Sequence, residues 1–337
     1  AKLLSCFGRT TSSAKPFADK HNCTPYTDLS TMLANPALDV VTICTPSGAH
    51  LEPAIAAANA GKHIIVEKPL EVTLSRCDAI IDACKKNGVQ CFTVFPSRFH
   101  ESSKLLKLAV DHKKFGKLSV GDAYVKWFRT QEYYDSGAWR GTWKLDGGGA
   151  LMNQAIHTVD LLSWLMGPVV EITAQADMLA HKRIEVEDIV VATLRFKNGA
   201  LGVIEATTAA YPGMLKRIEI HGTQGSAVLE EEDIKIWEVA KMTTADKKLV
   251  ARMAGRTKTG GGAADPSAIG HHAHAELFRD AIRAIQGKRS NSIDGAEGRR
   301  SVEIILAIYK AAESGKAVSL PLKRDPRLSY RKTGVKR

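Results

Sequence analysis

"DVVTICTPSGAHLEPAIAAANAGKHIIVEKPL", residues 39–70, decides the fold of this chain. Its two ends are short apolar runs rich in β-branched residues, which are typical of strands buried on both faces of a sheet. Between them, residues 50–61 have the apolar spacing of a helix that ends at Gly61. A strand, a helix and a second strand in this order predict a right-handed β-α-β unit with parallel strands.

The same alternation runs through the first hundred residues. Helical patterns occupy 13–22 and 75–88, and strand-like runs occupy 1–7 and 89–95. Repeated β-α-β units predict an α/β fold, a doubly wound Rossmann-type domain that binds a nucleotide at the carboxyl ends of its strands.

From residue 118 onward, the pattern changes to strands joined by hairpin turns such as 197–199. This predicts an α+β domain with a large, mostly antiparallel open sheet. We therefore expect nucleotide binding in 1–98 and substrate binding in 99–322. The lysine- and glycine-rich stretch 241–263 has no periodicity, which predicts a loop.

One part of a doubly wound domain is absent from the sequence. Such domains open with a strand and a G-x-G-x-x-G turn, and no such turn follows a strand here; residues 147–149 have the wrong spacing. We predict that ~30 residues precede residue 1 in the natural protein, enough for that strand and turn. A divergent fold without the turn is the alternative. We expect a cytoplasmic protein, and an export signal further upstream stays open.

"CFGRTTSS" closes the run at 1–7, where a ribose-reading residue belongs. An acidic residue there would bind the 2′-hydroxyl of NAD, but the chain offers Gly8, Arg9 and Thr10. Arginine beside hydroxyls can bind a 2′-phosphate, which favours NADP over NAD. The alternative is that Arg9 only stacks on the adenine or lies in solvent.

Composition excludes several classes of function. The chain has 337 residues and a net charge of +11, of which the basic tail 323–337 carries +6. The remainder is mildly basic, which suits an anionic small molecule better than nucleic acid, so we expect no nucleic-acid partner. The tail predicts a solvated, partly disordered end. No apolar run approaches the ~18 residues of a membrane helix, so we expect no membrane contact.

All six cysteines lie in the first 91 residues and none forms a C-x-x-C pair. Cys6, Cys44 and Cys91 fall in strand-like runs, so we interpret them as small core residues in a reducing compartment. The histidines at 271, 272 and 274 come without a carboxylate or cysteine partner for a metal, so we expect no metal site.

Three motifs, "CTPSGAH" (44–50), "VEKPL" (66–70) and "GGGALMNQAIHTVDLL" (147–162), give the chain a family resemblance. It resembles the Gfo/Idh/MocA oxidoreductases, relatives of glucose–fructose oxidoreductase and inositol dehydrogenase. The resemblance covers nearly the whole chain. It implies hydride transfer between a nicotinamide cofactor and a secondary hydroxyl of a sugar, an inositol or a sugar nucleotide. It also implies a homodimer or homotetramer that forms through the antiparallel sheet.

The resemblance assigns cofactor contacts to the crevice at the strand ends. Besides the residues that close the first strand, the resemblance predicts that the cofactor contacts Thr45, Pro46, His50, Glu67, Lys68, Pro69 and Arg98. Lys68, followed by a proline that is often cis in this family, would be catalytic. Burial near a positive nicotinamide ring should lower the pKa of this lysine. The alternatives are a helix-capping turn at 45–50 and a structural Glu67–Lys68 salt bridge.

The helix predicted from Gly149 to about Met166 carries the second catalytic candidate. Asn153, His157 and Asp160 are spaced to share one helical face. The resemblance makes His157 the group that meets the substrate hydroxyl, with Asp160 orienting its ring or capping local structure. Many relatives have aspartate where this chain has Asn153, so acid–base work would rest on Lys68 and His157.

Aromatic and arginine side chains crowd the segment before that helix, residues 129–149. Aromatic faces and guanidinium forks suit carbohydrate rings and anionic groups. The candidates for substrate binding are Tyr133, Tyr134, Trp139, Arg140, Trp143, Asn153, His157 and His274. A hydrophobic plug or a subunit contact is the alternative for the aromatic segment. Two other functions stay open: a cofactor-retaining glycosidase or isomerase-like enzyme, and a non-catalytic NAD(P)-binding regulator, for which Asn153 is the support.

Overall fold

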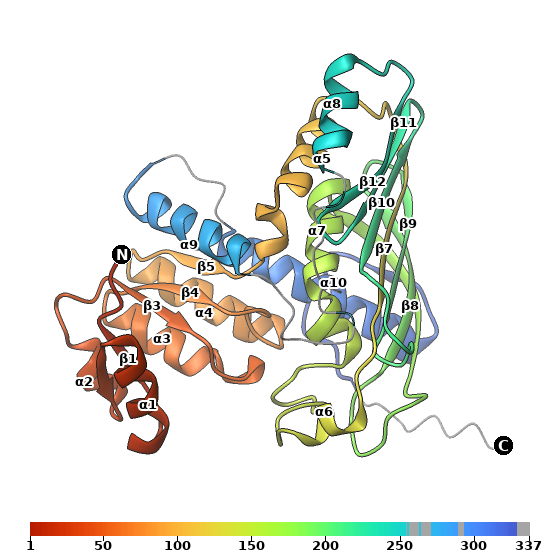
Figure 1. Cartoon of the computed structure of the whole chain (residues 1–337). Helices are drawn as coiled ribbons and strands as arrows, with labels where there is room; N and C mark the ends of the chain where they lie inside the picture. Colours follow the sequence, from red (N-terminus) through yellow and green to blue (C-terminus); the bar gives the residue numbers. More distant parts are fainter. Residues whose placement is uncertain (254, 256–262, 264–270, 289–292, 329–337) are drawn as a thin grey trace.

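The computed structural model describes residues 1–253, 255, 263, 271–288 and 293–328. An α/β domain at the N-terminus lies beside a large sheet that is covered by helices on one face (Figure 1). Both the parallel domain and the mostly antiparallel sheet were predicted from the sequence, and both are confirmed.

The N-terminal domain contains five short parallel strands. Two of them pair with each other and three form a second sheet in the order β3-β4-β5. The strands are β1 (Ser5–Phe7), β2 (Thr24–Tyr26), β3 (Val40–Ile43), β4 (His63–Val66) and β5 (Cys91–Thr93). The helices are α1 (Thr11–His21), α2 (Leu29–Leu33), α3 (Leu51–Asn59) and α4 (Leu74–Lys86). The sequence did not predict β2 and α2, which are too short for a periodic pattern.

Two sequence expectations, about the cysteines and about the basic tail, need correction. Cys91 is buried as expected, but Cys44 is exposed because it lies just beyond the end of β3. The basic tail is not wholly solvated: Asp325 accepts hydrogen bonds from the backbone N–H groups of Leu74 and Ser75, at 2.5 and 3.1 Å. Asp325 thereby satisfies free amides in the first turn of α4. Residues 329–337 lie outside the described residues.

The second sheet has eight strands in the order β12-β11-β10-β6-β9-β8-β7-β13. Strands β6 and β9 pair in parallel, and every other neighbouring pair is antiparallel. Their bounds are β6 (Leu118–Lys126), β7 (Val169–Asp177), β8 (Ile189–Phe196), β9 (Leu201–Thr207), β10 (Arg217–Gly222), β11 (Gly225–Glu230), β12 (Asp233–Val239) and β13 (Val318–Ser319).

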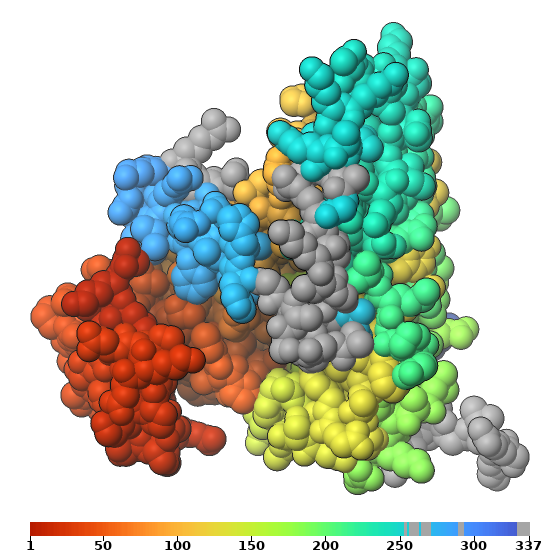
Figure 2. Space-filling model, in the orientation of Figure 1, coloured from red at the N-terminus to blue at the C-terminus, as the bar shows by residue number. Residues whose placement is uncertain are grey.

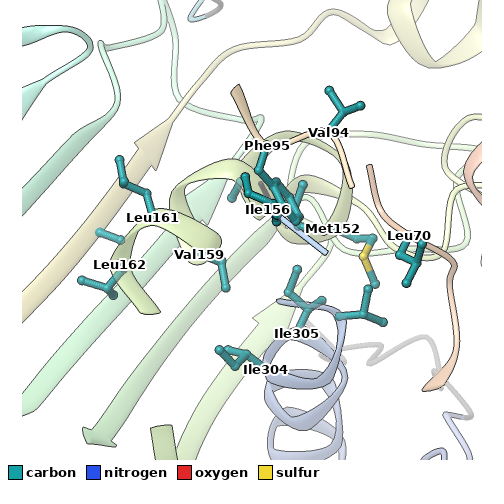
Figure 3. Packing of buried hydrophobic residues seen from close by; sticks show 14 of the residues in the cluster. Leu70, Val94, Phe95, Met152, Ile156, Val159, Leu161, Leu162, Ile304 and Ile305 are labelled. Carbon is teal, nitrogen blue, oxygen red and sulfur yellow. The ribbon is translucent and has the colours of Figure 1, made fainter. Parts of the chain in front are cut away.

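One apolar core includes buried residues of both domains. The helices over the sheet are α5 (Glu101–Asp111), α7 (Ile156–Met166), which continues η3 (Ala150–Ala155), and α10 (Gly295–Ser314) (Figure 1). Phe95 follows β5, and it packs with Met152, Ile156 and Ile305 from these helices, all fully buried (Figure 3). Burying each such side chain contributes roughly 1.5–3 kcal/mol, so this core holds the two domains together.

Later segments of the chain return to the first domain. Helix α9 (His272–Ile285) packs on η2 (Pro96–Phe99), and Phe92 in β5 pairs with Asp294. The domain limits at 98 and 322 stay predictions. None of the helices in the described ranges is long and apolar enough to cross a membrane.

The prediction of a loop at 241–263 is partly wrong, because this stretch contains helix α8 (Thr244–Met253). The side chains of Thr243 and Asp246 bond to each other's backbone N–H groups, which is the capping pattern of a helix start. Most of the remaining stretch lies outside the described residues.

Candidate active site

Lys68 lies just beyond the carboxyl end of β4, as the sequence predicted. The Lys68–Pro69 peptide bond is cis, as the resemblance implied. The ammonium group donates to the backbone oxygen of Asn153 at 2.6 Å and lies 3.3 Å from its Oδ1. This contact spans 85 residues and joins the first domain to the helix that carries His157. Figure 2 shows the surface hollowed between the first domain and the yellow segment around residues 131–146.

The environment of Lys68 lowers the pKa of its ammonium group. Burial is the main cause, and the positive charge of Arg140 adds to it. The carboxylates of Glu67 and Asp146 oppose the shift. Lys68 can therefore release or share a proton more readily than a solvated lysine.

The loop after β3 is fastened to the Lys68 turn by His50. This ring is buried, with Nδ1 2.9 Å from the oxygen of Pro69 and Nε2 2.9 Å from the oxygen of Thr45. The hydroxyl of Thr45 donates to the oxygen of Ala49 at 2.8 Å. Both strand ends are thus held at one edge of the sheet. His50 serves this link, while Thr45 is exposed beside it.

The helix predicted after Gly149 begins with a π turn, η3, rather than a regular α turn. Buried Glu187 accepts hydrogen bonds from the N–H groups of Gly149 and Leu151, both at 2.8 Å. The hydroxyl of Tyr309 donates to the same carboxylate at 3.0 Å. A Cβ at Gly149 would lie 1.7 Å from the Glu187 carbonyl oxygen, so only glycine fits. The π turn thereby fixes the positions of Asn153 and His157.

His157 is half-buried one turn beyond Asn153, with its ring edge-on to Phe95 at 5.8 Å. Among the described residues, its Nδ1 has no hydrogen-bond partner. Burial and the nearby charge of Lys68 are the main causes that hold the pKa of His157 well below its ordinary value. The imidazole is therefore neutral at physiological pH and can accept a proton.

The structure contradicts one role considered for Asp160, that of orienting His157. Its carboxylate accepts two bonds from the guanidinium of Arg98, at 2.6 and 2.7 Å, and one from Ser301 at 3.1 Å. Arg98 also donates to Glu297 at 2.8 Å. Both members of the pair are buried, so Arg98 joins η2, α7 and α10. Arg98 was predicted to bind cofactor, but its guanidinium is committed to these carboxylates.

Arg140 has the clearest site geometry in the aromatic segment. Its guanidinium carbon lies 4.3 Å from the ring centre of Tyr133 and 4.6 Å from that of Trp139, and it donates to the Tyr133 hydroxyl. Its charge also acts on Lys68. Arg140 and Trp139 therefore stay substrate-binding candidates, held as a stacked cation beside the lysine.

Two other aromatic candidates are structural. The Trp143 indole N–H donates to the oxygen of Glu185 at 2.9 Å, and the ring meets Tyr309 edge-on. Tyr134 is buried and its hydroxyl bonds Thr208 at 2.8 Å. The alternative of a hydrophobic plug thus fits these two residues better than substrate contact.

The remaining candidates are His274 in α9 and the residues after β1. His274 is half-buried, and its pKa is lowered by burial while Glu67 opposes the shift. The charge of His274 also acts on His157. At the other end, Arg9 is exposed and Thr10 caps α1 with its side chain. A Cβ at Gly8 would lie 2.6 Å from a serine hydroxyl in α1, so the chain turns tightly there.

Sequence reasoning missed three buried polar residues, Asp146, Gln154 and Glu187. Asp146 accepts from the side-chain amide of Asn153, and Gln154 donates to the Tyr133 hydroxyl at 3.1 Å. An aspartate directly before a glycine run was a signal for the first; Glu187 is distant in sequence and gave none. Among the described residues, no three histidine, cysteine or carboxylate side chains gather as a metal site.

A Rossmann-type α/β domain that presents a lysine at a strand end, beside a sheet domain that presents a histidine, is the architecture of a nucleotide-binding class of enzyme. Residues 1–95 match the oxidoreductase family with an NAD-binding Rossmann fold, and 104–228 match the GFO/IDH/MocA C-terminal domain. The chain belongs to the GFO/IDH/MocA family.

Individual relatives agree with this assignment. The chain is 34% identical over 212 residues to myo-inositol 2-dehydrogenase from Thermotoga maritima, covering 59% of each chain. It is 34% identical to levoglucosan dehydrogenase from Pseudarthrobacter phenanthrenivorans, over 61% of this chain and 58% of that one. The alignments thus span less than two thirds of these relatives. The WlbA dehydrogenase from Bordetella pertussis, solved with NADH and UDP-GlcNAcA, has a TM-score of 0.86 and 33% identity, covering 96% of this chain and 91% of that one.

Asp160→Asn separates a structural role from a catalytic one. Removing one charge of this buried pair should lower the free energy of unfolding by about 3 kcal/mol, because Arg98 then has only the partly exposed Glu297 as a charged partner. The pKa of His157, followed by NMR, should not move. A shifted His157 titration would contradict the assignment. Asp19→Asn, which breaks an exposed pair with Lys15, is the matched control and should cost under about 1 kcal/mol in chemical denaturation.

Proposed function

We propose that this protein is an NAD(P)-dependent oxidoreductase that transfers hydride between a secondary hydroxyl of a carbohydrate and the nicotinamide. The observation that carries the proposal is the Lys68 ammonium held on Asn153, one helical turn from His157. The pKa values of both groups are lowered mainly by burial. Family membership supports the same reaction class.

The residues at the strand ends fit a nicotinamide dinucleotide. Thr45 is exposed where β3 ends, and Glu67 is half-buried where β4 ends, so both face the edge at which α/β domains bind ligands. Thr45 and Pro46 would hold the pyrophosphate side, and Glu67 would meet the carboxamide or ribose. When bound, the cofactor accepts hydride from the carbinol carbon.

Proton transfer falls to the side chains of the chain itself. Neutral His157 accepts the hydroxyl proton as the carbon gives up hydride, which leaves a ketone and an imidazolium. The Lys68 ammonium donates a hydrogen bond to the same oxygen while its negative charge develops. The lowered pKa of each group matches its part: His157 is free to accept, and Lys68 shares its proton readily.

For the substrate, we propose an acidic sugar nucleotide of the UDP-GlcNAcA kind. The high coverage of the structure solved with that ligand supports this choice. Cationic side chains also act on the reacting residues: Arg140 acts on Lys68, and Lys216 acts on His157. A crevice bordered by positive charge favours an anionic substrate.

The test is nicotinamide reduction by the full-length protein with UDP-GlcNAcA, UDP-GlcNAc, myo-inositol and levoglucosan in turn. We expect turnover with UDP-GlcNAcA and much less with UDP-GlcNAc, which lacks the carboxylate. Equal turnover with inositol would refute the substrate class. Binding of cofactor and sugar without hydride transfer would favour the regulator. Absorbance of the purified protein in the reduced-nicotinamide band controls for cofactor already held.

Variants of Lys68 test its role in the same assay. Lys68→Met should lower kcat about 100-fold or more, because one donor to the developing alkoxide is lost. In the wild type, the rate should fall at high pH as Lys68 deprotonates, with a midpoint below the ordinary lysine pKa. Lys68→Arg should lack that fall, since a guanidinium stays charged. An unchanged high-pH limb in Lys68→Arg would remove Lys68 from the mechanism.

The cofactor's phosphate class depends on Arg9, and we propose NADP. Arg9 is exposed at the end of β1 beside the hydroxyl groups of Thr10 and Ser12, and no acidic residue stands there to bind a 2′-hydroxyl. The NADH-bound relatives make NAD the competing choice. Arg9→Ala should weaken NADP binding about tenfold and leave NAD binding within about twofold, measured by calorimetry. Equal loss for both cofactors would exclude a 2′-phosphate contact.

We also propose that the outer face of the eight-stranded sheet forms a homodimer or homotetramer. Val191 and Leu201 are 45% and 50% exposed there, beside a hollow of about 470 Å³ lined by residues of β6–β9. Val191→Glu with Leu201→Glu should convert the assembly to monomers in light scattering, because charge would enter the interface. Thr42→Glu, exposed on the first domain, is the control. A wild-type monomer at all concentrations would refute the proposal.

A further inference from the structure

A buried carboxylate beside the site has no part in the mechanism above. Asp146 is 1% exposed and lies directly before the glycine run 147–149. One of its oxygens accepts from the N–H of Gly141 at 2.8 Å, and the other accepts from Nδ2 of Asn153 at 2.5 Å. It therefore touches the residue on which the Lys68 ammonium rests.

Asn153 stands between a pure acceptor and a pure donor. An ionised carboxylate only accepts hydrogen bonds, and an ammonium only donates them. With Nδ2 turned to Asp146, the amide oxygen of Asn153 must face Lys68, where it lies 3.3 Å from Nζ. The opposite rotamer would set the amide N–H against the ammonium and its oxygen against the carboxylate. Asp146 thus selects one orientation of a group that could otherwise turn over.

The charge of Asp146 also acts on Lys68 and on its neighbours. Its carboxylate opposes the lowering of the Lys68 pKa. The charged and titratable groups that face it are Lys68, Arg140, Tyr133 and Tyr134. Burial raises the pKa of Asp146 to about 6, with the N–H of Gly141 and the Lys68 charge opposing. A protonated Asp146 would no longer dictate how Asn153 is turned.

We propose that Asp146 is a positioning residue: it turns the Asn153 amide so that Oδ1 accepts from the Lys68 ammonium alongside the backbone oxygen, and it supplies the negative charge that this lysine needs nearby. The inference rests on the proposed function for its kinetic consequences. Its structural part, the link from Asp146 through Asn153 to Lys68, stands on the hydrogen bonds alone.

The kinetic test compares Asp146→Asn with the double variant Asp146→Asn/Asn153→Asp. The single variant should lower kcat about tenfold or more with little change in KM. A misplaced Lys68 ammonium would weaken the hydrogen bond to the reacting oxygen in the transition state and would affect substrate binding little. Its high-pH limb should move to lower pH, since the carboxylate that raises the Lys68 pKa is gone. The double variant returns a carboxylate beside Lys68 and should move the limb back. Asp135→Asn, an exposed aspartate of α6 (Gln131–Asp135), should change neither.

A second measurement needs no variant at Asp146 and no turnover. In wild-type protein labelled at asparagine, the side-chain amide signal of Asn153, assigned with Asn153→Asp, should shift with a midpoint near pH 6 as Asp146 is protonated. If no sugar is oxidised but this titration is seen, the proposed function fails and the positioning link holds. An Asn153 signal that ignores pH, or a single variant with wild-type kcat and pH profile, would overturn the inference.

Discussion

The position of the reacting side chains depends on one buried carboxylate, Glu187. It receives the N–H groups of Gly149 and Leu151, which lie at the entry of η3 and would otherwise be unpaired in the core. The same η3 turn carries Asn153, and α7 begins just before His157. Because a Cβ at Gly149 would clash with the Glu187 carbonyl oxygen, only glycine lets η3 begin this close to Glu187. Glu187 therefore helps to set the positions of Asn153 and His157, which follow on the same helix.

Burial governs the charges of the site in opposite directions for acids and bases. It lowers the pKa values of Lys68 and His157, and it raises those of Asp146 and Glu187 to about 6 and about 7. A carboxyl whose pKa is raised on folding binds a proton more tightly in the native state than in the unfolded state. Stability therefore falls as pH rises from the ordinary carboxyl pKa through these values. The fold tolerates this cost where the carboxylates orient backbone and amide groups.

The parts predicted from sequence are those set by local pattern. Parallel strands, the antiparallel sheet, Lys68 at the end of β4 and the helix with His157 all follow from periodicity and motif. The roles of Arg98 and Asp160 did not, because their pairing joins residues 62 positions apart in sequence, and a lone arginine near a strand end looks the same whether it meets a ligand or a buried aspartate. The π turn was equally hidden, since it depends on Glu187. Helix α8 had a readable cap in Thr243 and Asp246 that composition obscured.

Asparagine at 153 was the one support for a non-catalytic protein, but it does not remove the negative charge near Lys68. The carboxylate is on Asp146 instead of on residue 153. A carboxylate at 153 would contact the Lys68 ammonium directly and raise its pKa strongly. Because the amide of Asn153 lies between them, the Asp146 carboxylate is one side chain further from Lys68. Its charge opposes the lowering of the Lys68 pKa, but burial has the larger effect on that pKa. The lysine is then held in place by a neutral oxygen while its proton stays loosely bound. A proton donor to a developing alkoxide needs that combination, whereas a protein that only senses its ligand does not.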